Sequence, residues 1–307
     1  MSEHALNFYA GAGLDRVDKR RRDRDWISAR LADPATRFLP VWRGRNLVAD
    51  PERPALAWLG NDEARVYLDA GAAWALLGLI GGQCYVVVDV SAEETPDHAP
   101  ALVGRGHFSD LRVVGPHLAH AEGALLAYAR GIVYWHARHR HCGVCGAETE
   151  AVDGGHVRRC RNPDCGTQHF PRTDPAVIML VHDGGERCVL GRQKVWPPGM
   201  RSTLAGFLEP GESLEEAVAR EVEEEVGLSV DQVTYHSSQP WPFPSSLMVG
   251  FYARAPFGPL RVDPDELEAA GWYDRRSLLA SPEDETLRLP RRDSIARRLV
   301  DDWLKQG

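Results

Sequence analysis

The sequence predicts an α/β protein with a C-terminal α/β sandwich, a central metal-binding ribbon and an N-terminal mixed α+β domain. From Pro175 onward, short apolar runs typical of strands alternate with amphipathic helices, which is the pattern of an α/β sandwich. Four cysteines fall in one short window, and a length of 307 residues favours two or more domains at about 150 residues each. We expect domains at 1–130, 131–171 and 172–307.

Composition excludes several classes of protein. Hydrophobic residues make up 43% and charged residues 26%, which is ordinary for a globular protein and unlike collagen or disordered chains. The 44 acidic residues outnumber the 36 basic ones, so no bulk basic surface for duplex nucleic acid is expected. The longest apolar stretch, 70–80, is too short to cross a bilayer, and the first residues lack a signal-peptide pattern. We expect a cytoplasmic protein with no membrane partner.

The first 130 residues mix strand-like runs with turns. We expect strands at 64–68 (ARVYL) and 84–90 (CYVVVDV), and a buried helix around Trp74 to Ile80. A further helix is expected from Ala119 to Ala137, leading into the cysteines.

The four clustered cysteines have the spacing of a zinc site. Cys142 and Cys145 form one pair, Cys160 and Cys165 form the other, and each pair lies on a turn that contains glycine. Tetrahedral zinc takes four thiolates, and four ligands without an open position indicate a structural ion. The alternative is four reduced cysteines in a core. Five nearby histidines are expected to be solvated at the surface: His136, His139, His141, His156 and His169.

An acidic helix is expected at 214–226. Ser213 is a good N-cap, Glu216 three residues later completes a capping box, and Gly227 is a natural end. Its apolar residues recur every four positions and mark the buried stripe: Leu214, Val218, Val222 and Val226.

Three carboxylates share one face of this helix. Glu221, Glu224 and Glu225 stand at i, i+3 and i+4, and no lysine lies among residues 206–228 to relieve their repulsion. Hard divalent cations such as Mg²⁺ or Mn²⁺ take oxygen ligands and neutralise a pyrophosphate. The alternative is a solvated acidic face.

A proline-rich segment at 238–246 presents two aromatic residues. Alternating prolines restrict the backbone to extended geometry, so Trp241 and Phe243 lose little entropy on stacking against a flat heterocycle. We expect the two rings to face opposite sides, with Phe243 in the pocket and Trp241 in the core. A polyproline ligand is the alternative, but the register is P-x-P-x-P rather than P-x-x-P.

These motifs resemble a known family. Residues 206–228 fill every fixed position of G-x5-E-x7-R-E-U-x-E-E-x-G-U, where U is aliphatic, and this is the Nudix box. The SQPWPFP-x-S segment and the four cysteines are similar to the NADH pyrophosphatase branch of the Nudix hydrolases. The resemblance covers roughly residues 120–307 and implies a Nudix α/β/α sandwich. We recognise no motif in the first 120 residues.

The resemblance implies roles for individual residues. Divalent metal would bind Glu221, Glu224, Glu225, Glu266 and the carbonyl of Ala205, with one box glutamate as general base and an Arg220–Glu212 pair tying the loop to the helix. Substrate contacts would come from Phe170, Gln239, Pro240, Trp241, Pro242, Phe243, Pro244, Ser245, Ser246 and the Ala296 backbone. The chain departs from the branch at Phe170, often tyrosine there, and at Gly155, where an acid can stand.

The function implied by the resemblance is hydrolysis of NADH or NAD⁺ to a nicotinamide mononucleotide and AMP. The same chemistry could remove NAD caps from RNA 5′ ends, since a single strand needs only a basic groove. A non-catalytic nucleotide-sensing or RNA-binding module is the hypothesis of another class. We expect one structural zinc per chain, Mg²⁺ or Mn²⁺ as catalytic ion, and a homodimer.

Overall fold

The computed structural model describes residues 6–50 and 52–306, which divide into two compact units. The N-terminal unit contains residues 9–173 together with 242–245. The C-terminal unit contains residues 174–241 and 246–306 together with residues 6–8. Among the described residues, no helix has the length and apolar character needed to cross a membrane.

The C-terminal unit is built on one mixed sheet. Its strands are β9 (Asp174–His182), β10 (Arg187–Arg192), β11 (Leu204–Phe207), β12 (Gln232–Trp241), β13 (Ser246–Arg254) and β14 (Ala269–Asp274). They are arranged in the order β12-β13-β9-β10-β14, and β11 pairs with β9. The central strand β9 is parallel to β13 and antiparallel to β10 and β11.

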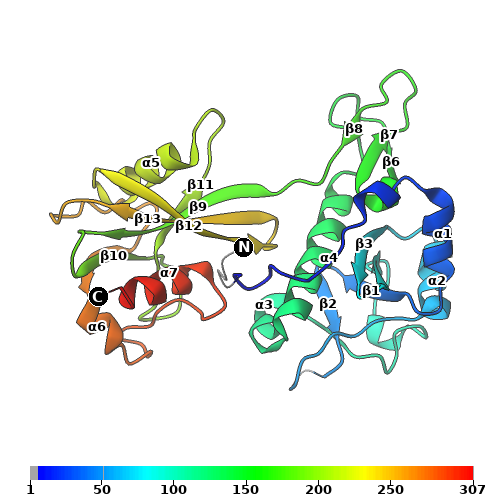
Figure 1. The fold of residues 1–307 in the computed structure, drawn as a ribbon, viewed down its shortest axis with the longest axis horizontal. Helices are drawn as coiled ribbons and strands as arrows, with labels where there is room; N and C mark the ends of the chain where they lie inside the picture. The colour runs from blue at the N-terminus through cyan, green and yellow to red at the C-terminus, as the bar shows by residue number, and fades with distance from the viewer. Residues whose placement is uncertain (1–5, 51, 307) are drawn as a thin grey trace. The chain divides into compact units, whose positions relative to one another are not determined.

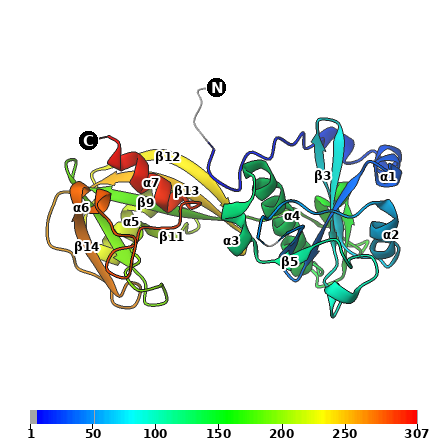
Figure 2. The same cartoon turned by 90° about the horizontal axis from the view of Figure 1, so that it is seen from below.

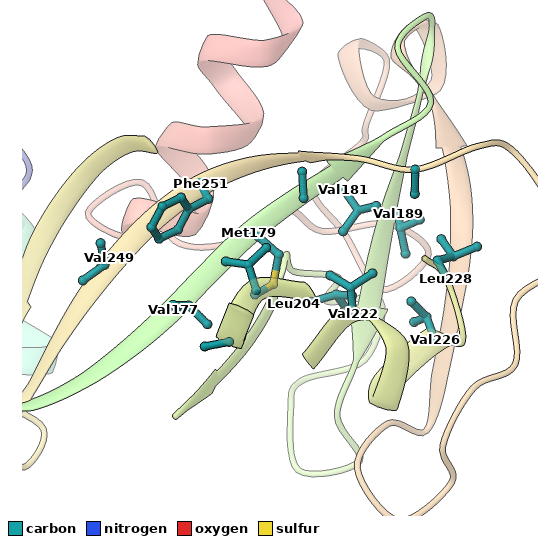
Figure 3. Close-up of a cluster of buried hydrophobic side chains, with 14 of the residues drawn as sticks. Val177, Met179, Val181, Val189, Leu204, Val222, Val226, Leu228, Val249 and Phe251 are labelled. Atoms are coloured by element: carbon teal, nitrogen blue, oxygen red, sulfur yellow. The ribbon is translucent and has the colours of Figure 1, made fainter. Parts of the chain in front are cut away.

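Helices cover both faces of this sheet. They are α5 (Leu214–Val226), the short α6 (Arg275–Leu279) and α7 (Ile295–Leu304), with α5 and α7 on opposite faces (Figure 1). Alternate residues of β9 supply two separate cores: Val177 and Met179 pack with α5, whereas Ile178 and Leu180 pack with α7. Figure 3 shows the first of these cores. The predicted α/β/α sandwich is confirmed.

The predicted ends of α5 are also confirmed. The Ser213 hydroxyl accepts a hydrogen bond from the Glu216 amide at 3.2 Å, and the Glu216 carboxylate accepts one from the Ser213 amide at 2.8 Å. Gly227 ends the helix in the left-handed conformation, at φ 69°. This geometry is accessible to glycine without the penalty that a Cβ atom imposes.

The N-terminal unit has a sheet of its own. Its strands are β1 (Arg37–Trp42), β2 (Arg45–Val48), β3 (Trp74–Ile80), β4 (Gln83–Asp89) and β5 (His107–Ser109), in the order β3-β4-β1-β2-β5. Its helices are α1 (Arg24–Ala32), α2 (Asn61–Asp69), α3 (Leu111–Val114) and α4 (His120–Arg138) (Figure 2). The long helix α4 packs on β1, β3 and β4, and α2 packs on β1 and β4.

The helix expected around Trp74 to Ile80 is wrong, because this segment is strand β3, paired antiparallel with β4. A seven-residue apolar run carries no periodicity that separates a buried helix from a buried strand. The decisive signals are its length and the Gly81–Gly82 turn that joins it to β4, both typical of a hairpin. Burial on both faces removed the alternation of polar and apolar residues that marks a half-exposed strand.

The strand expected at 64–68 is also wrong, because these residues lie within α2. The helix begins after Gly60, whose amide donates to the Glu63 carboxylate at 2.6 Å. Ala64 and Tyr67, one turn apart, are its buried residues. The acidic first turn was the helix-start signal that outweighs the β-propensity of valine and tyrosine.

A small ribbon follows α4. It contains β6 (Thr149–Val152), β7 (Val157–Cys160) and β8 (Gln168–His169), in the order β6-β7-β8. The helix expected at 119–137 is confirmed as α4. Because α4 is continuous from His120 to Arg138, the expected domain boundary at 130 falls inside a helix.

Candidate active site

Three carboxylates converge in the C-terminal unit. Glu221 and Glu225 come from successive turns of α5, and Glu266 comes from the loop before β14. One oxygen from each lies within 4.8 Å of the others. Glu221 and Glu225 are 7% and 3% exposed, whereas Glu266 is exposed. Two nearly buried carboxylates beside a third form a concentrated negative charge.

The surroundings of these carboxylates fit a divalent cation. Burial, together with the charges of Glu221 and Glu266, raises the pKa of Glu225 to about 8. Among the described residues, the Oε2 atom of Glu225 has no hydrogen-bond partner. A buried, unpartnered carboxylate oxygen in an all-oxygen group suits Mg²⁺ or Mn²⁺.

The first glycine of the Nudix box makes room for Glu221. A Cβ atom at Gly206 would overlap the Glu221 carboxylate. The carboxylate can therefore lie against the backbone of β11 only because this position has no side chain. Ala205, the preceding residue, lies in β11 within the same sheet as Gly206.

Arg220 connects the loop to the helix. Its guanidinium donates to both carboxylate oxygens of Glu212, at 2.6 and 3.0 Å, and to the carbonyl of Phe207 at 2.9 Å. It also donates to Glu221 and Glu224, each at 2.9 Å. These contacts hold the pKa of Glu212 at about 2 and raise that of Arg220. The expected Arg220–Glu212 pair is confirmed.

Glu224 does not join the group of converging carboxylates. Its side chain is 50% exposed and is held by Arg220. Glu221 and Glu225 converge as expected of the box glutamates, whereas Glu224 lies beside Glu221 outside the group, with Glu224 Oε2 and Glu221 Oε1 each 2.9 Å from Arg220 Nη1. In a helix, residues i and i+4, here Glu221 and Glu225, point in nearly the same direction. Residue i+3, here Glu224, is rotated to the other side of residue i, toward solvent. The metal-binding role of Glu224 stays a prediction.

A cavity of about 320 Å³ brings together residues from three of the sequence motifs. Ala205 and Glu225 of the Nudix region line it, as do Gln239 and Trp241 of the proline-rich motif and Ala296 of α7. This convergence was predicted only by resemblance, because the three segments are far apart in the sequence.

Gln239 is 0% exposed and its amide is occupied within the C-terminal unit. Its Nε2 donates to the carbonyls of Asp293, at 2.7 Å, and Phe8, at 3.0 Å, while its Oε1 accepts from the Ile295 amide at 2.7 Å. The side chain therefore ties β12 to the start of α7, where Ala296 lines the cavity. Its polar atoms position this wall.

Sequence reasoning missed several residues of the cavity. Trp196, Thr203 and Arg291 line it. Thr203 is 4% exposed, and its hydroxyl has no hydrogen-bond partner among the described residues. These residues belong to no recognised motif, so only the folded structure identifies them.

The proline-rich motif divides at a hairpin turn. Pro240 and Trp241 end β12, Ser246 begins β13 opposite Trp241, and the four-residue turn consists of Pro242, Phe243, Pro244 and Ser245. Trp241, expected in the core, lines the cavity instead, whereas Phe243 does not line it, and the substrate contact of Phe243 stays a prediction. Residues i and i+2 of a strand share one face, so the turn, and not strand alternation, separates the two rings.

Phe243 packs within the N-terminal unit. Its ring meets the Tyr9 ring edge to face, with centroids 5.7 Å apart. The guanidinium of Arg130 lies 4.9 Å from its centroid, and that of Arg112 lies 5.5 Å away. These contacts are typical of an aromatic ring held by cation–π interactions.

Two other expected substrate positions lie in the N-terminal unit. Phe170 follows β8 and is 56% exposed, so its ring is available for stacking. Gly155 is buried at φ 85°, and a Cβ atom there would overlap the Trp74 carbonyl and Ala75. An acidic side chain cannot occupy this position without moving β3.

The four ribbon cysteines form a single cluster. Sulfur atoms of Cys145 and Cys160 are 3.4 Å apart, and those of Cys142 and Cys165 are 3.9 Å apart. A zinc ion with Zn–S bonds of about 2.3 Å separates its sulfur ligands by about 3.8 Å. The cluster therefore has the dimensions of a tetrahedral zinc site, and the backbone amide of Val144 donates to Cys142 at 3.4 Å.

The surface placement expected for the five histidines is wrong for two of them, which are buried. His136 and His156 are 2% and 9% exposed, and burial lowers the pKa of each to about 4. His169 is partly buried, with its Nε2 3.3 Å from the Cys142 sulfur. Neutral imidazoles with internal partners, such as Tyr128 for His156, stabilise the core of this unit.

Family models match three consecutive regions of the chain. Residues 172–297 match the NUDIX domain, residues 137–170 the NADH pyrophosphatase zinc ribbon domain, and residues 35–135 the NADH pyrophosphatase-like rudimentary NUDIX domain. The NAD-capped RNA hydrolase NudC of Mycobacterium bovis is 38% identical, over 95% of this chain and 92% of that protein.

The chain belongs to the Nudix hydrolases, in their NADH pyrophosphatase branch. The NAD-capped RNA hydrolase NUDT12 of Macaca fascicularis is 33% identical, over 99% of this chain and 74% of that protein. Its human counterpart of the same name is 32% identical over the same shares. This Nudix hydrolase therefore carries a zinc ribbon, and its N-terminal sheet is a rudimentary NUDIX domain, which no sequence motif had indicated.

Proposed function

We propose that this Nudix hydrolase cleaves the central pyrophosphate of NADH or NAD⁺, giving a nicotinamide mononucleotide and AMP. The observation that carries the proposal is the cavity that joins Glu225 of the Nudix box to Trp241 of the SQPWPFP-x-S motif. Glu225, one of the converging carboxylates suited to a metal-bound phosphate, lines this cavity together with a ring suited to stacking on a nicotinamide or adenine.

In this reaction, water forms a bond to one phosphorus and the bond from that phosphorus to the bridging oxygen breaks. The bridging oxygen leaves as part of a phosphate monoester, and the proton of the attacking water passes to a glutamate of the Nudix box. Glu221, Glu225 and Glu266 would hold the divalent ion, together with Glu224 and the Ala205 carbonyl as the family resemblance implies. A bound Mg²⁺ or Mn²⁺ supplies charge stabilisation for the phosphoryl oxygens and acidifies water.

Protein side chains would provide orientation. Trp241 would stack on one base of the dinucleotide, and Gln239 would hold the start of α7 so that Ala296 presents its backbone to the substrate. Phe170, Phe243 and the rest of the 240–246 segment stay proposed substrate contacts. Their support is the family motif and, for Phe170, an exposed ring.

Removal of NAD caps from RNA is a second proposed activity, by the same bond cleavage. Its support is that both sets of relatives are named NAD-capped RNA hydrolases. A cap shares its pyrophosphate and nicotinamide with free NAD, so the same cavity would serve. The alternative of a non-catalytic binding module is disfavoured by the converging, nearly buried carboxylates, since repulsion among them is a cost that a metal site explains.

We further propose that the ribbon holds a structural zinc and that the protein is a homodimer. We also propose a three-domain chain with boundaries near 130 and 171, and a cytoplasmic location. The spacing of Cys142, Cys145, Cys160 and Cys165, which suits zinc rather than disulfide bonds, supports a reducing compartment. Sedimentation of the purified protein tests the dimer.

Incubation of the zinc-loaded protein with NADH, NAD⁺ and NAD-capped RNA tests the activity, with products identified by mass. We expect a mononucleotide and AMP from the free dinucleotides and a 5′-monophosphate RNA from the capped one, each requiring added Mg²⁺ or Mn²⁺. Turnover without a divalent ion, or the same turnover by Glu225→Gln, would contradict the proposed site.

A further inference from the structure

A second cavity lies within the N-terminal unit, apart from any residue of the Nudix box. Its volume is about 1090 Å³. Its walls come from the 43–44 turn after β1, the 70–74 segment before β3, the end of β4, helix α4 and strands β6 and β7 of the ribbon. It therefore joins the rudimentary NUDIX domain to the zinc ribbon.

Four arginines line this cavity: Arg43, Arg130, Arg140 and Arg158. None of them forms an ion pair with any residue that the structure describes, whereas 16 other arginines do. The two lining acids, Glu150 and Asp89, compensate them only in part. Glu150 is paired with Arg159, which leaves Asp89 as the one lining acid without an ion pair among the described residues, against four arginines.

The arginines are held in place by other contacts. Arg158 donates to the Thr149 hydroxyl at 2.7 Å and to His136, and Arg130 donates to the Gly44 carbonyl at 2.8 Å. The Nη1 atom of Arg130 is buried without a hydrogen-bond partner among the described residues. Repelling guanidinium groups with unused donors favour an anion between them.

Aromatic residues complete the lining. Trp74 and Tyr134 are both half-buried and both line the cavity. Guanidinium groups for phosphates and flat rings for bases are the combination by which proteins bind single-stranded nucleic acid. The volume lies at the upper end of small-molecule sites, which are about 300–1,000 Å³, and so favours more than one nucleotide.

We propose that this cavity binds phosphate-bearing ribonucleotide units, and that its occupant is a segment of single-stranded RNA rather than a free nucleotide. The choice of RNA over a free nucleotide rests on the proposed activity toward capped RNA as well as on the volume. The binding itself needs no turnover, so it can be tested separately.

The test is fluorescence anisotropy of an uncapped, fluorescein-labelled single-stranded RNA of eight nucleotides with the full zinc-loaded chain. Arg140→Glu reverses one charge in the cavity at an exposed side chain with no ion pair among the described residues. Arg161→Glu is the matched control, because Arg161 lies in the same ribbon, also close to a zinc cysteine, but does not line the cavity and is 62% exposed. Zinc content and melting temperature report whether each variant is folded.

We expect Arg140→Glu to weaken RNA binding about tenfold and to reduce the slope of log K against log salt by about 0.7 per lost phosphate contact. Arg161→Glu should change affinity less than about threefold. Tyr134→Leu should weaken binding about tenfold without changing the salt slope, since it removes a base contact. Equal loss in the Arg140 and Arg161 variants would overturn the proposal, as would equal affinity for duplex RNA.

Competition identifies the occupant. If AMP displaces the probe at the same concentration of nucleotide units as the RNA, the cavity is a binding site for a free nucleotide and the RNA assignment is wrong. Weak competition by AMP supports RNA as the occupant. If inorganic phosphate competes as strongly as AMP, the proposed contact between the cavity and a base is refuted. If the wild-type chain binds RNA in this way but does not hydrolyse NADH or a capped RNA, the proposed function fails while the cavity assignment stands.

Discussion

Replacing Glu225 with glutamine should remove the pH dependence that this residue imposes on stability. In the folded protein, burial and the neighbouring Glu221 and Glu266 raise the pKa of Glu225 to about 8, against an ordinary value of 4.5. Between pH 4.5 and pH 8, Glu225 is therefore protonated in the metal-free folded state and ionised in the unfolded state. An acid with a raised pKa contributes its stability below pH 4.5 and loses it as the pH rises through 8.

The size of the effect follows from the linkage between protonation and folding. Each pH unit within this window changes the free energy of unfolding by at most about 1.4 kcal/mol, so raising the pH from 6 to 8 costs the wild type up to about 3 kcal/mol. Glutamine stays neutral and avoids this loss. At about 2–4 °C per kcal/mol, the melting temperature of Glu225→Gln should exceed that of the wild type at pH 8 by up to about 10 °C.

Thermal melts between pH 6 and 8.5, with and without Mn²⁺, measure this effect. Glu223→Gln is the matched control, because Glu223 is exposed on the same helix and does not belong to the converging group. Mn²⁺ at about 100 times its Kd should stabilise the wild type by about 2.7 kcal/mol and remove its loss at high pH, but should stabilise Glu225→Gln much less. Parallel pH curves for all three proteins, or equal stabilisation by Mn²⁺, would refute the reasoning.

Three further predictions follow from the site. Glu225→Gln and Glu224→Gln should each lower kcat for NADH at least about a hundredfold, because each removes a charge that would hold the metal; a near-normal kcat in either variant would remove that glutamate from the proposed metal site. Gln239→Ala should lower stability by about 2–4 kcal/mol and raise KM for NADH, because the Ile295 amide and Asp293 carbonyl lose this partner; an unchanged KM in a destabilised protein would limit Gln239 to stability. Mild EDTA should abolish turnover while about one zinc per chain remains, as metal analysis will show, whereas Cys160→Ser should lose the zinc and the fold of the ribbon.

The sequence predicted elements whose signals are local. Helix α5 was predicted with its ends because Ser213, Glu216 and Gly227 act within a few residues of one another. The zinc cluster was predictable for the same reason, since each pair of cysteines lies on one turn. The Nudix spacing identified the carboxylates, and their convergence with Glu266 followed the family pattern.

Features that depend on distant contacts were not predictable in this way. Strand β3 is apolar throughout because helices cover both faces of its sheet, so its sequence lacks the alternation of a strand. The burial of Glu225 and the outward turn of Glu224 depend on how α5 packs against β11, which helix periodicity alone does not specify. Thr203 and Arg291 reach the cavity through loops without a motif, and the arginine cavity draws on segments from residue 43 to residue 158.

The most direct test of the central claim is the identity of the products formed from NADH in the presence of Mn²⁺. The wild type should release reduced nicotinamide mononucleotide and AMP in equal amounts, and Trp241→Ala should form the same products with a raised KM, since stacking against one base contributes about 1–3 kcal/mol. Release of nicotinamide or ADP-ribose, or no cleavage by a zinc-loaded and folded protein, would contradict the account.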